Sequence, residues 1–414
     1  MTGVAEALAQ IVPGVRFTAY DGSSGGEGPI GIHLRSRKAL AHLVAAPGEL
    51  GFGRAYVSGE MDLDAPSHLE ALRVLHRRKH ADLTWGERLQ VLRSLGREAL
   101  VPVTAPPQEV GARRLLAGLV AHTPGRDAVA IAHHYDVSNR FYEWVLGPTM
   151  AYTCAVYTTE DTSLEDAQRE KFDLVCRKLD LKPGQRLLDV GCGWGGMVRH
   201  AAEHYGVRAL GVTLSRQQAE WAQKAIAEDG LSDLAEVRHA DYRSVQESGF
   251  DAVSSIGLTE HIGVANIPAY ASRLADRLRP GGRLLNHCIT RTSVDKPSIS
   301  KRGFIQRYVF PDGELPSVSE VVREIERAGL EVRHEENLRE HYAKTCLAWT
   351  HGLDAHWDEA VAEVGLGTAR VWALYLAGSA LGFQENNIQL HQVLAVRTVD
   401  GDSGMPLRPD FSVR

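Results

Sequence analysis

The sequence predicts an α/β protein, with a mostly parallel sheet covered by helices on both faces and a smaller, mainly helical N-terminal domain. From about residue 165, short apolar runs alternate with helical patterns, as in a parallel sheet. The apolar run Arg186–Val190 leads directly into a glycine-rich loop, which is typical of the first strand of such a sheet. The 414 residues, 44% of them hydrophobic, are enough for two domains and exclude a disordered chain.

Charge and cysteine content exclude several functional classes. The formal net charge of −6 gives no global sign of nucleic-acid binding. No apolar run reaches the roughly 18–20 residues of a membrane span, and the N-terminus lacks a basic-then-apolar signal segment. The five cysteines are odd in number and form no C-x-x-C pair, so we expect reduced thiols, a cytoplasmic protein and no structural zinc.

The first 103 residues are expected to form the N-terminal domain, with a strand-like run at Ile30–Leu34 followed by helical patterns. Three prolines between Val101 and Glu109 predict a linker, which we place at residues 104–120. Residues 71–100 hold seven basic and three acidic side chains, with leucines at near-helical spacing. This local excess is compatible with docking on an anionic membrane surface, or with a solvated basic face over a small helical core.

The larger domain is expected at residues 121–414. A helix starts at Ser215 with Gln218 at the spacing of a capping box, and another covers Ser317–Ala328. Residues 340–382 form a helical insertion before the last strand, which should run antiparallel because two late strands close the sheet. The seven expected strands are Arg186–Val190, Arg208–Thr213, Ala235–His239, Asp251–Ile256, Gly282–Ile289, Leu330–Glu335 and Ile388–Arg397.

The glycine-rich loop after the first of these strands predicts a ligand site. Its glycines let the backbone approach a ligand closely where open α/β sheets bind ligands. The spacing of the glycines is also compatible with binding of a nicotinamide dinucleotide. In dinucleotide-binding folds, however, an acidic residue at the end of the second strand binds the ribose, and this strand ends in Thr213. Asp189, directly before the loop, fits S-adenosylmethionine better, and a purely structural tight turn remains an alternative.

Eight motifs, in order along the chain, carry a resemblance to a known family. They are Tyr135–Phe141, Thr149–Tyr157, Leu187–Gly195, Gly211–Ser215, Ser255–Gly263, Leu284–Thr290, His341–Lys344 and Ile388–Gln392. Over roughly residues 120–400 the chain resembles the cyclopropane-fatty-acyl-phospholipid synthases and the mycolic acid cyclopropane synthases. The resemblance implies a class I S-adenosylmethionine-dependent methyltransferase fold, Rossmann-like and seven-stranded. Gly48–Asp64 looks like the extra domain of the phospholipid-acting members, which implies lipid or membrane docking.

Phe310–Leu315 and Glu385–Ile388 look closest to an actinobacterial branch of this family. That resemblance implies methyl transfer to the cis double bond of an oleoyl-type phospholipid chain, giving a 10-methylene chain, the precursor of tuberculostearic acid. A separate flavin-dependent reductase would then saturate the product. It also implies peripheral association with the inner face of the cell membrane. A homodimer is one of the oligomeric states compatible with the sequence. The alternatives are a cyclopropane-forming synthase, a methyltransferase for a soluble acceptor, and a noncatalytic lipid-binding relative.

Residue by residue, the resemblance assigns the cofactor to the glycine loop and to neighbouring strand ends. Tyr242 stands where the family commonly has tryptophan and keeps an aromatic face for the adenine. The residues assigned to S-adenosylmethionine are Tyr135, Tyr152, Thr153, Asp189, Gly191, Gly193, Trp194, Gly195, Thr213, Leu214, Gln218, Asp241 and Tyr242.

The resemblance also implies a bicarbonate ion beside the transferred methyl group. Its holders would be Cys154, Glu260, His287, the backbone of Ile289, and Tyr342. His287 and Tyr342 can donate hydrogen bonds to the ion, and Glu260 can accept one from its hydroxyl group. No metal is expected, because neither Glu260-His261 nor the doublet His133-His134 has further ligands at chelating spacing.

Alkylation of an alkene leaves a carbocation, so the site should be dry and aromatic. The aromatic candidates are Phe141, Trp144, Tyr152, Tyr157 and Tyr342, with plain core packing an equal alternative for Phe141 and Trp144. The sequence departs from the family at Ser379, where some members have a cysteine, and at His391, where tryptophan is common. Ser379 cannot act as a covalent thiol. His391 is expected to alter the local packing or the shape of the substrate that fits.

Overall fold

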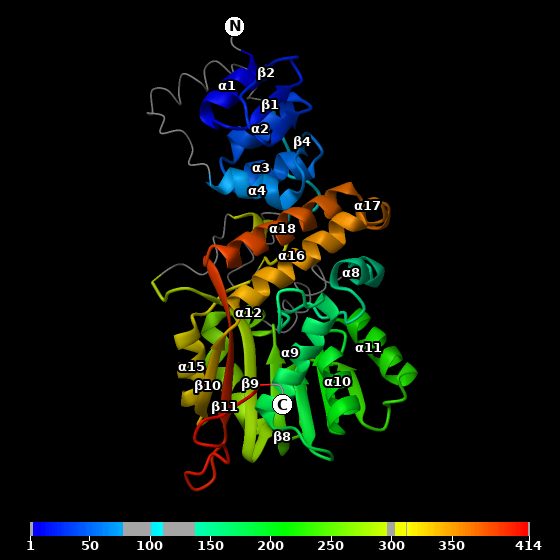
Figure 1. The fold of residues 1–414 in the computed structure, drawn as a ribbon, viewed down its shortest axis with the longest axis vertical. Coiled ribbons are helices and arrows are strands. Elements are labelled where there is room, and N and C mark those ends of the chain that lie inside the picture. Colours follow the sequence, from blue (N-terminus) through cyan, green and yellow to red (C-terminus); the bar gives the residue numbers. More distant parts are fainter. Residues whose placement is uncertain (1–2, 78–100, 111–136, 296–302, 312, 413–414) are drawn as a thin grey trace. The chain divides into compact units, whose positions relative to one another are not determined.

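The computed structural model describes residues 3–77, 101–110, 137–295, 303–311 and 313–412 (Figure 1). The chain divides into two compact units. The first comprises residues 1–116, 300–311 and 349–381, and the second comprises residues 117–299, 312–348 and 382–414. Each unit therefore combines segments that are far apart in the sequence. The division into a domain at 1–103, a linker at 104–120 and a catalytic domain at 121–414 stays a prediction.

The described N-terminal part of the first unit combines helices with a small sheet. Its strands lie in the order β2-β1-β3-β4, with β1 and β3 parallel and the other two pairs antiparallel. The elements are α1 (Val4–Ile11), β1 (Arg16–Ala19), β2 (Ser24–Gly25), β3 (Gly31–Leu34), α2 (Arg37–Ala45), α3 (Glu49–Val57), β4 (Met61–Asp64) and α4 (His68–Arg77).

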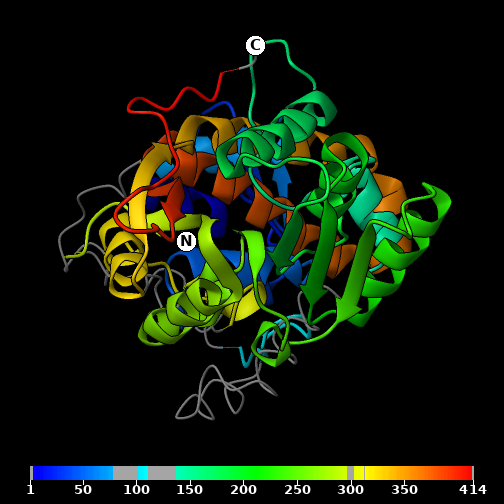
Figure 2. The same ribbon diagram turned by 90° about the horizontal axis from the view of Figure 1, so that it is seen from below.

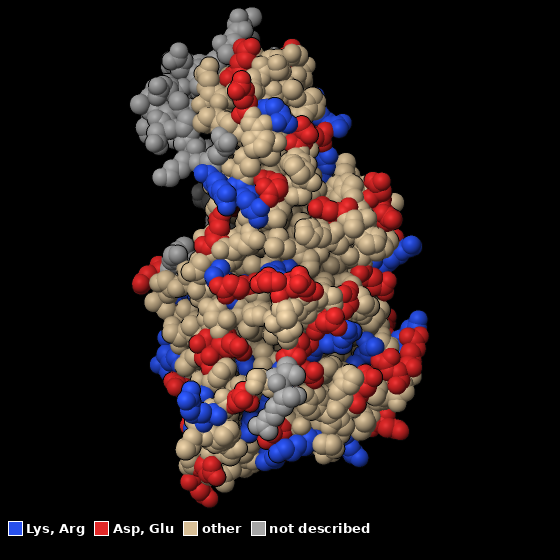
Figure 3. Space-filling view, in the orientation of Figure 1, with Lys and Arg blue, Asp and Glu red and all other residues tan. Residues whose placement is uncertain are grey.

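Residues 101–110 contain no helix or strand, as the prolines predict. Arg54 of α3 holds this segment through two hydrogen bonds to the Glu109 carboxylate, at 2.7 and 2.6 Å. Of the basic stretch at 71–100, residues 78–100 lie outside the described residues. Among the described helices, none combines the length and apolar character needed to cross a membrane. On the face drawn in Figure 3, basic and acidic side chains are interspersed.

The second unit contains the seven-stranded sheet that the sequence predicts. The strand order is β10-β11-β9-β8-β5-β6-β7, and β11 runs antiparallel to both of its neighbours, which confirms the expected antiparallel last strand. The other four strand pairs are parallel. The strands are β5 (Arg186–Val190), β6 (Arg208–Thr213), β7 (Ala235–His239), β8 (Phe250–Ile256), β9 (Leu278–Arg291), β10 (Glu331–Asn337) and β11 (Ile388–Val396).

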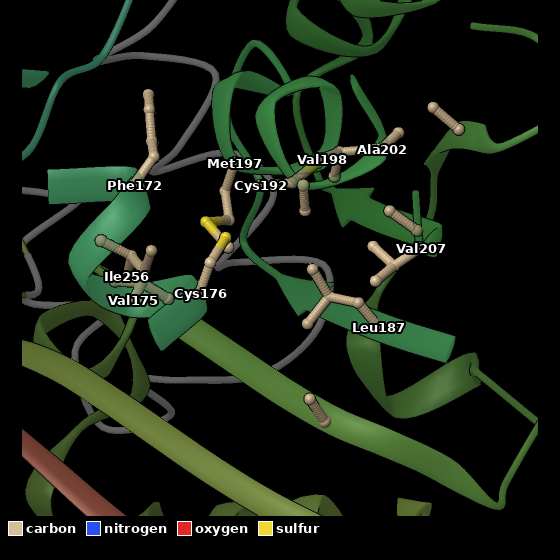
Figure 4. Packing of buried hydrophobic residues seen from close by; sticks show 14 of the residues in the cluster. Phe172, Val175, Cys176, Leu187, Cys192, Met197, Val198, Ala202, Val207 and Ile256 are labelled. Carbon is tan, nitrogen blue, oxygen red and sulfur yellow. The ribbon is translucent and has the colours of Figure 1, made fainter. Parts of the chain in front are cut away.

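Helices cover both faces of this sheet (Figure 2). Successive side chains of β5 point to opposite faces, so Leu187 joins one buried cluster and Leu188 the other. Figure 4 shows the first cluster, to which Val175, Met197 and Leu187 contribute buried side chains. The helices of the second unit include α8 (Asn139–Leu146), α9 (Leu164–Leu179), α10 (Gly196–Tyr205), α11 (Arg216–Glu228), α12 (Thr259–Ile262), α13 (Ile267–Arg277) and α15 (Val318–Arg327).

The remaining helices are α14 (Phe304–Tyr308), α16 (Arg339–Ala355), α17 (Trp357–Val364) and α18 (Leu366–Gln384), the last three falling in the predicted helical insertion. The capping box expected at α11 is only half formed. Ser215 accepts a hydrogen bond from the backbone N–H of Gln218, but the Gln218 side chain accepts from the Thr213 hydroxyl at 2.8 Å instead of reaching back to Ser215. Gln218 is thereby fixed at the end of β6, beside the glycine loop.

Candidate active site

The glycine loop follows β5 at the carboxyl end of the parallel strands. Gly191 and Cys192 both donate backbone hydrogen bonds to the carbonyl of Val212, at 2.9 and 3.0 Å, which ties the loop to β6. Gly193 and Gly195 have φ angles of +55° and +76°, a region that favours glycine. A Cβ atom on Gly195 would lie 3.0 Å from the Cβ of Ala222, whereas one on Gly193 would meet nothing within 4 Å. The loop is therefore packed behind Gly195 and open at Gly193.

Two adjoining pockets meet at this loop. Gly191, Gly193, Gln218 and Gly257 line both of them. The first pocket has a volume of about 640 Å³, open solvent included, and is also lined by Thr213, Leu214, Ala240, Tyr242, Leu258 and His261. The second has a volume of about 530 Å³ by the same measure and is also lined by Tyr152, Thr153, Lys171, Phe172, Asp189 and Trp194.

The structure thus brings together most of the residues assigned to the cofactor. Ten line the pockets: Tyr152, Thr153, Asp189, Gly191, Gly193, Trp194, Thr213, Leu214, Gln218 and Tyr242. Gly195 lies behind the loop against Ala222. Asp241 is turned toward Arg243, with an ion pair at 2.6 Å. Tyr135 and the doublet His133-His134 lie outside the described residues.

The second pocket contains two buried charged groups. Asp189 is 2% exposed and accepts a hydrogen bond from the Ser254 hydroxyl at 2.7 Å, and burial raises its pKa to about 6. Lys171 is 1% exposed and its Nζ donates to the Thr153 hydroxyl at 2.9 Å. Burial lowers the pKa of Lys171 to about 7. The second pocket therefore contains one carboxyl group and one amine, whose hydrogen bonds go to different residues, Ser254 and Thr153.

Lys171 lies outside the motifs that assign the cofactor residues, although the helix around it carries a signal. Gln168, Lys171, Val175 and Lys178 recur at the spacing of one helix face. In α9 all four side chains are buried, which places two lysines and a glutamine on the face directed at the core. Polar residues at core positions are uncommon and mark functional or structural polar contacts.

Glu260, on α12, lies in an apolar setting with half of its carboxylate unsatisfied. It is 8% exposed, and its Oε1 accepts from the backbone N–H of Ile289 at 2.6 Å. Its Oε2 has no hydrogen-bond partner within the part of the chain that the structure describes. Burial raises the pKa of Glu260 to about 7. The Ile289 backbone, assigned to bicarbonate, therefore engages Glu260 in this structure.

His287 and Cys154 are fully buried and electrically neutral. Burial, helped by the charges of Lys171 and Lys178, holds the pKa of His287 well below its usual range. Its Nε2 has no partner among the described residues. Cys154 donates its S–H to the carbonyl of Ala155 at 3.2 Å, and burial raises its pKa, so it is a thiol rather than a thiolate.

Aromatic ring contacts occur at residues of the second pocket and at Tyr342 on α16. Tyr342 is 7% exposed and stacks on Phe383 with ring centroids 4.4 Å apart. Tyr142, which sequence analysis did not assign, packs against both Trp194 and Tyr152, at centroid distances of 4.8 and 5.9 Å. Tyr142 therefore packs against two residues that line the second pocket.

The other aromatic candidates lie in different surroundings. Phe141 is fully buried on α8, as in ordinary core packing, and Trp144 lies against the guanidinium of Arg140 at 5.2 Å. Tyr157 stacks on His341 with ring centroids 6.4 Å apart. None of these three lines either pocket.

The two family departures have distinct settings. His391 on β11 lies between the Thr290 hydroxyl, 2.8 Å from its Nδ1, and Glu335, 3.4 Å from its Nε2. Burial lowers the pKa of His391 to about 4, so it is a neutral link across the sheet. Ser379 lies on α18, among residues of the first unit.

The chain is similar to known proteins over most of its length. The family model described as mycolic acid cyclopropane synthetase matches residues 122–393. A Mycobacterium tuberculosis protein described as a probable fatty acid methyltransferase is 54% identical over 404 residues, covering 95% of this chain and 94% of that protein. The cyclopropane-fatty-acyl-phospholipid synthase of Escherichia coli strain K12 is 35% identical over 268 residues, covering 64% of this chain and 67% of that protein.

Two solved structures of cyclopropane synthases align with about two thirds of this chain. The cyclopropane synthase MmaA2 from Mycobacterium tuberculosis aligns with a TM-score of 0.62 at 34% identity, covering 66% of this chain and 99% of that one. The mycolic acid cyclopropane synthase CmaA1, complexed with S-adenosylhomocysteine and CTAB, aligns with a TM-score of 0.62 at 33% identity, covering 65% and 98%.

Proposed function

The chain belongs to the mycolic acid cyclopropane synthetase family of S-adenosylmethionine-dependent methyltransferases, and on that premise we propose that it methylates the cis double bond of an unsaturated phospholipid acyl chain. The proposed substrate is oleoyl-type and the product a 10-methylene chain, formed with bicarbonate as the base. The observation that carries the proposal is the pair of buried, unpartnered polar atoms, Glu260 Oε2 and His287 Nε2. Buried polar atoms are rarely left unsatisfied, so this pair favours a small polar ligand.

The pockets fit S-adenosylmethionine. Tyr242 offers an aromatic face for the adenine in the first pocket, and Gly193 leaves its backbone open to a ligand. In the second pocket, Asp189 can accept from the amino group and Lys171 can pair with the carboxylate of the methionine end. When bound, the cofactor supplies an electrophilic methyl group to an otherwise weakly nucleophilic alkene.

The hydrogen-bonding capacities of three buried side chains match those of a bicarbonate ion. His287 can donate from Nε2, Tyr342 can donate its hydroxyl, and Glu260 can accept a hydrogen bond through Oε2. When bound, bicarbonate supplies the base that takes the proton. Cys154 and His287 are buried and neutral, so neither side chain presents a charged nucleophile to a sulfonium or a carbocation.

The methylene product is proposed over a ring on the resemblance of Phe310–Leu315 and Glu385–Ile388 to the methylene-forming branch. The ring product is the second candidate, favoured by the 35% identity to the Escherichia coli cyclopropane-fatty-acyl-phospholipid synthase. The proposal includes a cytoplasmic location with peripheral association at the inner face of the membrane, a separate flavin-dependent reductase that consumes the product, and a homodimer. Its N-terminal residues would provide the docking surface.

Expression in a bacterial host without such an enzyme tests the product. We expect phospholipid fatty acids one methylene unit heavier than the host's monounsaturated chains, and ozonolysis should convert the new chain into a ketone. A matched Glu260→Gln strain should lack the product, with a loss of about 100-fold or more. A product that resists ozonolysis would indicate the ring, and unchanged phospholipids with a methylated soluble compound would overturn the proposal.

A further inference from the structure

A row of side chains crosses three neighbouring strands and ends at the buried His287. Glu336 of β10 lies opposite Gln392 of β11, and Gln392 lies opposite His287 of β9. Lys178 of α9 closes the row from one face of the sheet. Its Nζ donates to Glu336 Oε2 at 2.5 Å and to Gln392 Oε1 at 2.7 Å. These contacts join a partly exposed carboxylate to the buried imidazole.

Lys178 determines which way the Gln392 amide points. A lysine ammonium group has donors only, so it must face the amide oxygen rather than the amide nitrogen. Lys178 and Gln392 are both fully buried, and the ion pair with Glu336 opposes the effect of burial, which lowers the pKa of Lys178. The amide N–H₂ group of Gln392 is therefore directed at His287, with its nitrogen 3.2 Å from Nδ1.

The direction of the amide sets the tautomer of the imidazole. The Gln392 nitrogen can only donate, so Nδ1 of His287 accepts, and the single proton of the neutral ring lies on Nε2. We infer that Lys178 and Gln392 are positioning residues that hold His287 as the Nε2–H tautomer. The buried Nε2 then presents a hydrogen-bond donor to an anion. The identity of that anion as bicarbonate rests on the proposed function.

Nitrogen-15 NMR of the full-length protein, labelled at histidine, tests the tautomer directly. The two His287 signals are assigned by their loss in His287→Gln. We expect a pyridine-like shift for Nδ1 and a pyrrole-like shift for Nε2, without added ligand. The isosteric Gln392→Glu carboxylate can accept from both Lys178 and Nδ1–H, so it should exchange the two shifts. Gln389→Glu, on the same strand but not in the row, should leave them unchanged.

A binding measurement tests the consequence. Titration with carbon-13-labelled bicarbonate, at saturating S-adenosylhomocysteine, should show about a tenfold to hundredfold loss of affinity in Gln392→Glu, with S-adenosylhomocysteine affinity changed less than about twofold. Lys178→Met should give mixed His287 signals, because the amide loses its orienting partner.

Two results would overturn the inference: a pyrrole-like Nδ1 in the parent protein, or a tautomer that Gln392→Glu leaves unchanged. Such results alongside a methylated lipid product would leave the proposed function standing. The expected tautomer in a protein that binds no bicarbonate would support the positioning role and contradict the proposed base.

Discussion

At the scale of single residues, burial rather than ion pairing sets the protonation of the site. It raises the pKa of Glu260 to about 7 and that of Asp189 to about 6, and it lowers that of Lys171 to about 7. It also holds His287 and Cys154 in their neutral forms. Groups whose pKa values lie near neutrality can change state during a reaction cycle at low cost.

The pH dependence of activity should follow Glu260. This carboxyl is protonated below about pH 7, and it accepts a hydrogen bond from the hydroxyl group of bicarbonate more strongly as a carboxylate, so kcat/KM should increase as the pH rises through about 7. The measurement is kcat/KM on either side of that pH at constant free bicarbonate. Glu335→Gln, at a carboxylate on β10, should retain the rise. A kcat/KM that declines over the same range would argue against this role for Glu260.

Lys171 should contribute specifically to the amino-acid end of the cofactor. Lys171→Met removes the buried ammonium beside Thr153, so the affinity for S-adenosylhomocysteine should fall by about tenfold or more. The affinity for 5′-methylthioadenosine, which lacks the amino-acid group, should change little. Calorimetric titration with both ligands measures the difference. Lys178→Met removes the other buried lysine of α9 and should spare both affinities; an equal loss for both ligands in Lys171→Met would indicate general disruption.

At the scale of elements, the sequence predicts the strands of the second unit to within a few residues. Most of them are apolar runs bounded by polar or glycine-rich turns, whereas β7 and β10 carry several polar residues. The resemblance to the family assigns most of the pocket residues, and the parallel sheet brings them together because its strand ends meet at one edge. The sequence does not predict which of several possible hydrogen-bond partners a polar group binds. Gln218 turns to Thr213 instead of completing a capping box, and the Ile289 backbone binds Glu260. Such choices depend on distances between elements, which local spacing does not contain.

Two glycines of the loop should respond differently to alanine. Both have positive φ, which costs an alanine about 1–2 kcal/mol. At Gly195 the new methyl group would also press on Ala222 at 3.0 Å, so Gly195→Ala should lower the free energy of unfolding by more than Gly193→Ala. At Gly193 the methyl group would enter the pockets. Gly193→Ala should therefore reduce the free energy of cofactor binding by more than it reduces the free energy of unfolding. Urea denaturation and S-adenosylhomocysteine titration of both variants measure the pair, and reversed rankings would contradict the assignment of the loop.

At the scale of the whole molecule, the sequence patterns predict two domains but not which distant segments make up each compact unit. The Arg370 guanidinium of α18 donates to the backbone carbonyls of Tyr56 and Met61, at 2.7 and 3.0 Å, within the first unit. The sequence predicts helical patterns in the first 103 residues and a helical insertion at residues 340–382, but it does not indicate that such distant segments share a unit. The membrane-docking role of the basic stretch remains a prediction, since residues 78–100 lie outside the described residues.

The pH dependence of the free energy of unfolding should reflect the burial of the Glu260 carboxyl group. The pKa of Glu260 rises from an ordinary 4.5 to about 7 on folding, so the folded chain binds more protons between these values. The stability from this group is present below about pH 4.5 and is lost as the pH rises through about 7, with a magnitude on the order of 3 kcal/mol. Glu260→Gln should therefore flatten the pH dependence of the free energy of unfolding, measured by urea denaturation without cofactor. Parallel pH curves for the two proteins would show that Glu260 is not desolvated.

The most direct test of the central claim follows a labelled methyl group. Purified protein is incubated with bicarbonate, S-adenosylmethionine labelled in its methyl group, and vesicles of either dioleoyl or fully saturated phospholipid. The account predicts label in the acyl chains of the dioleoyl vesicles only, and none with Glu260→Gln. Label in the saturated vesicles, in the lipid head group or only in a soluble acceptor would contradict it.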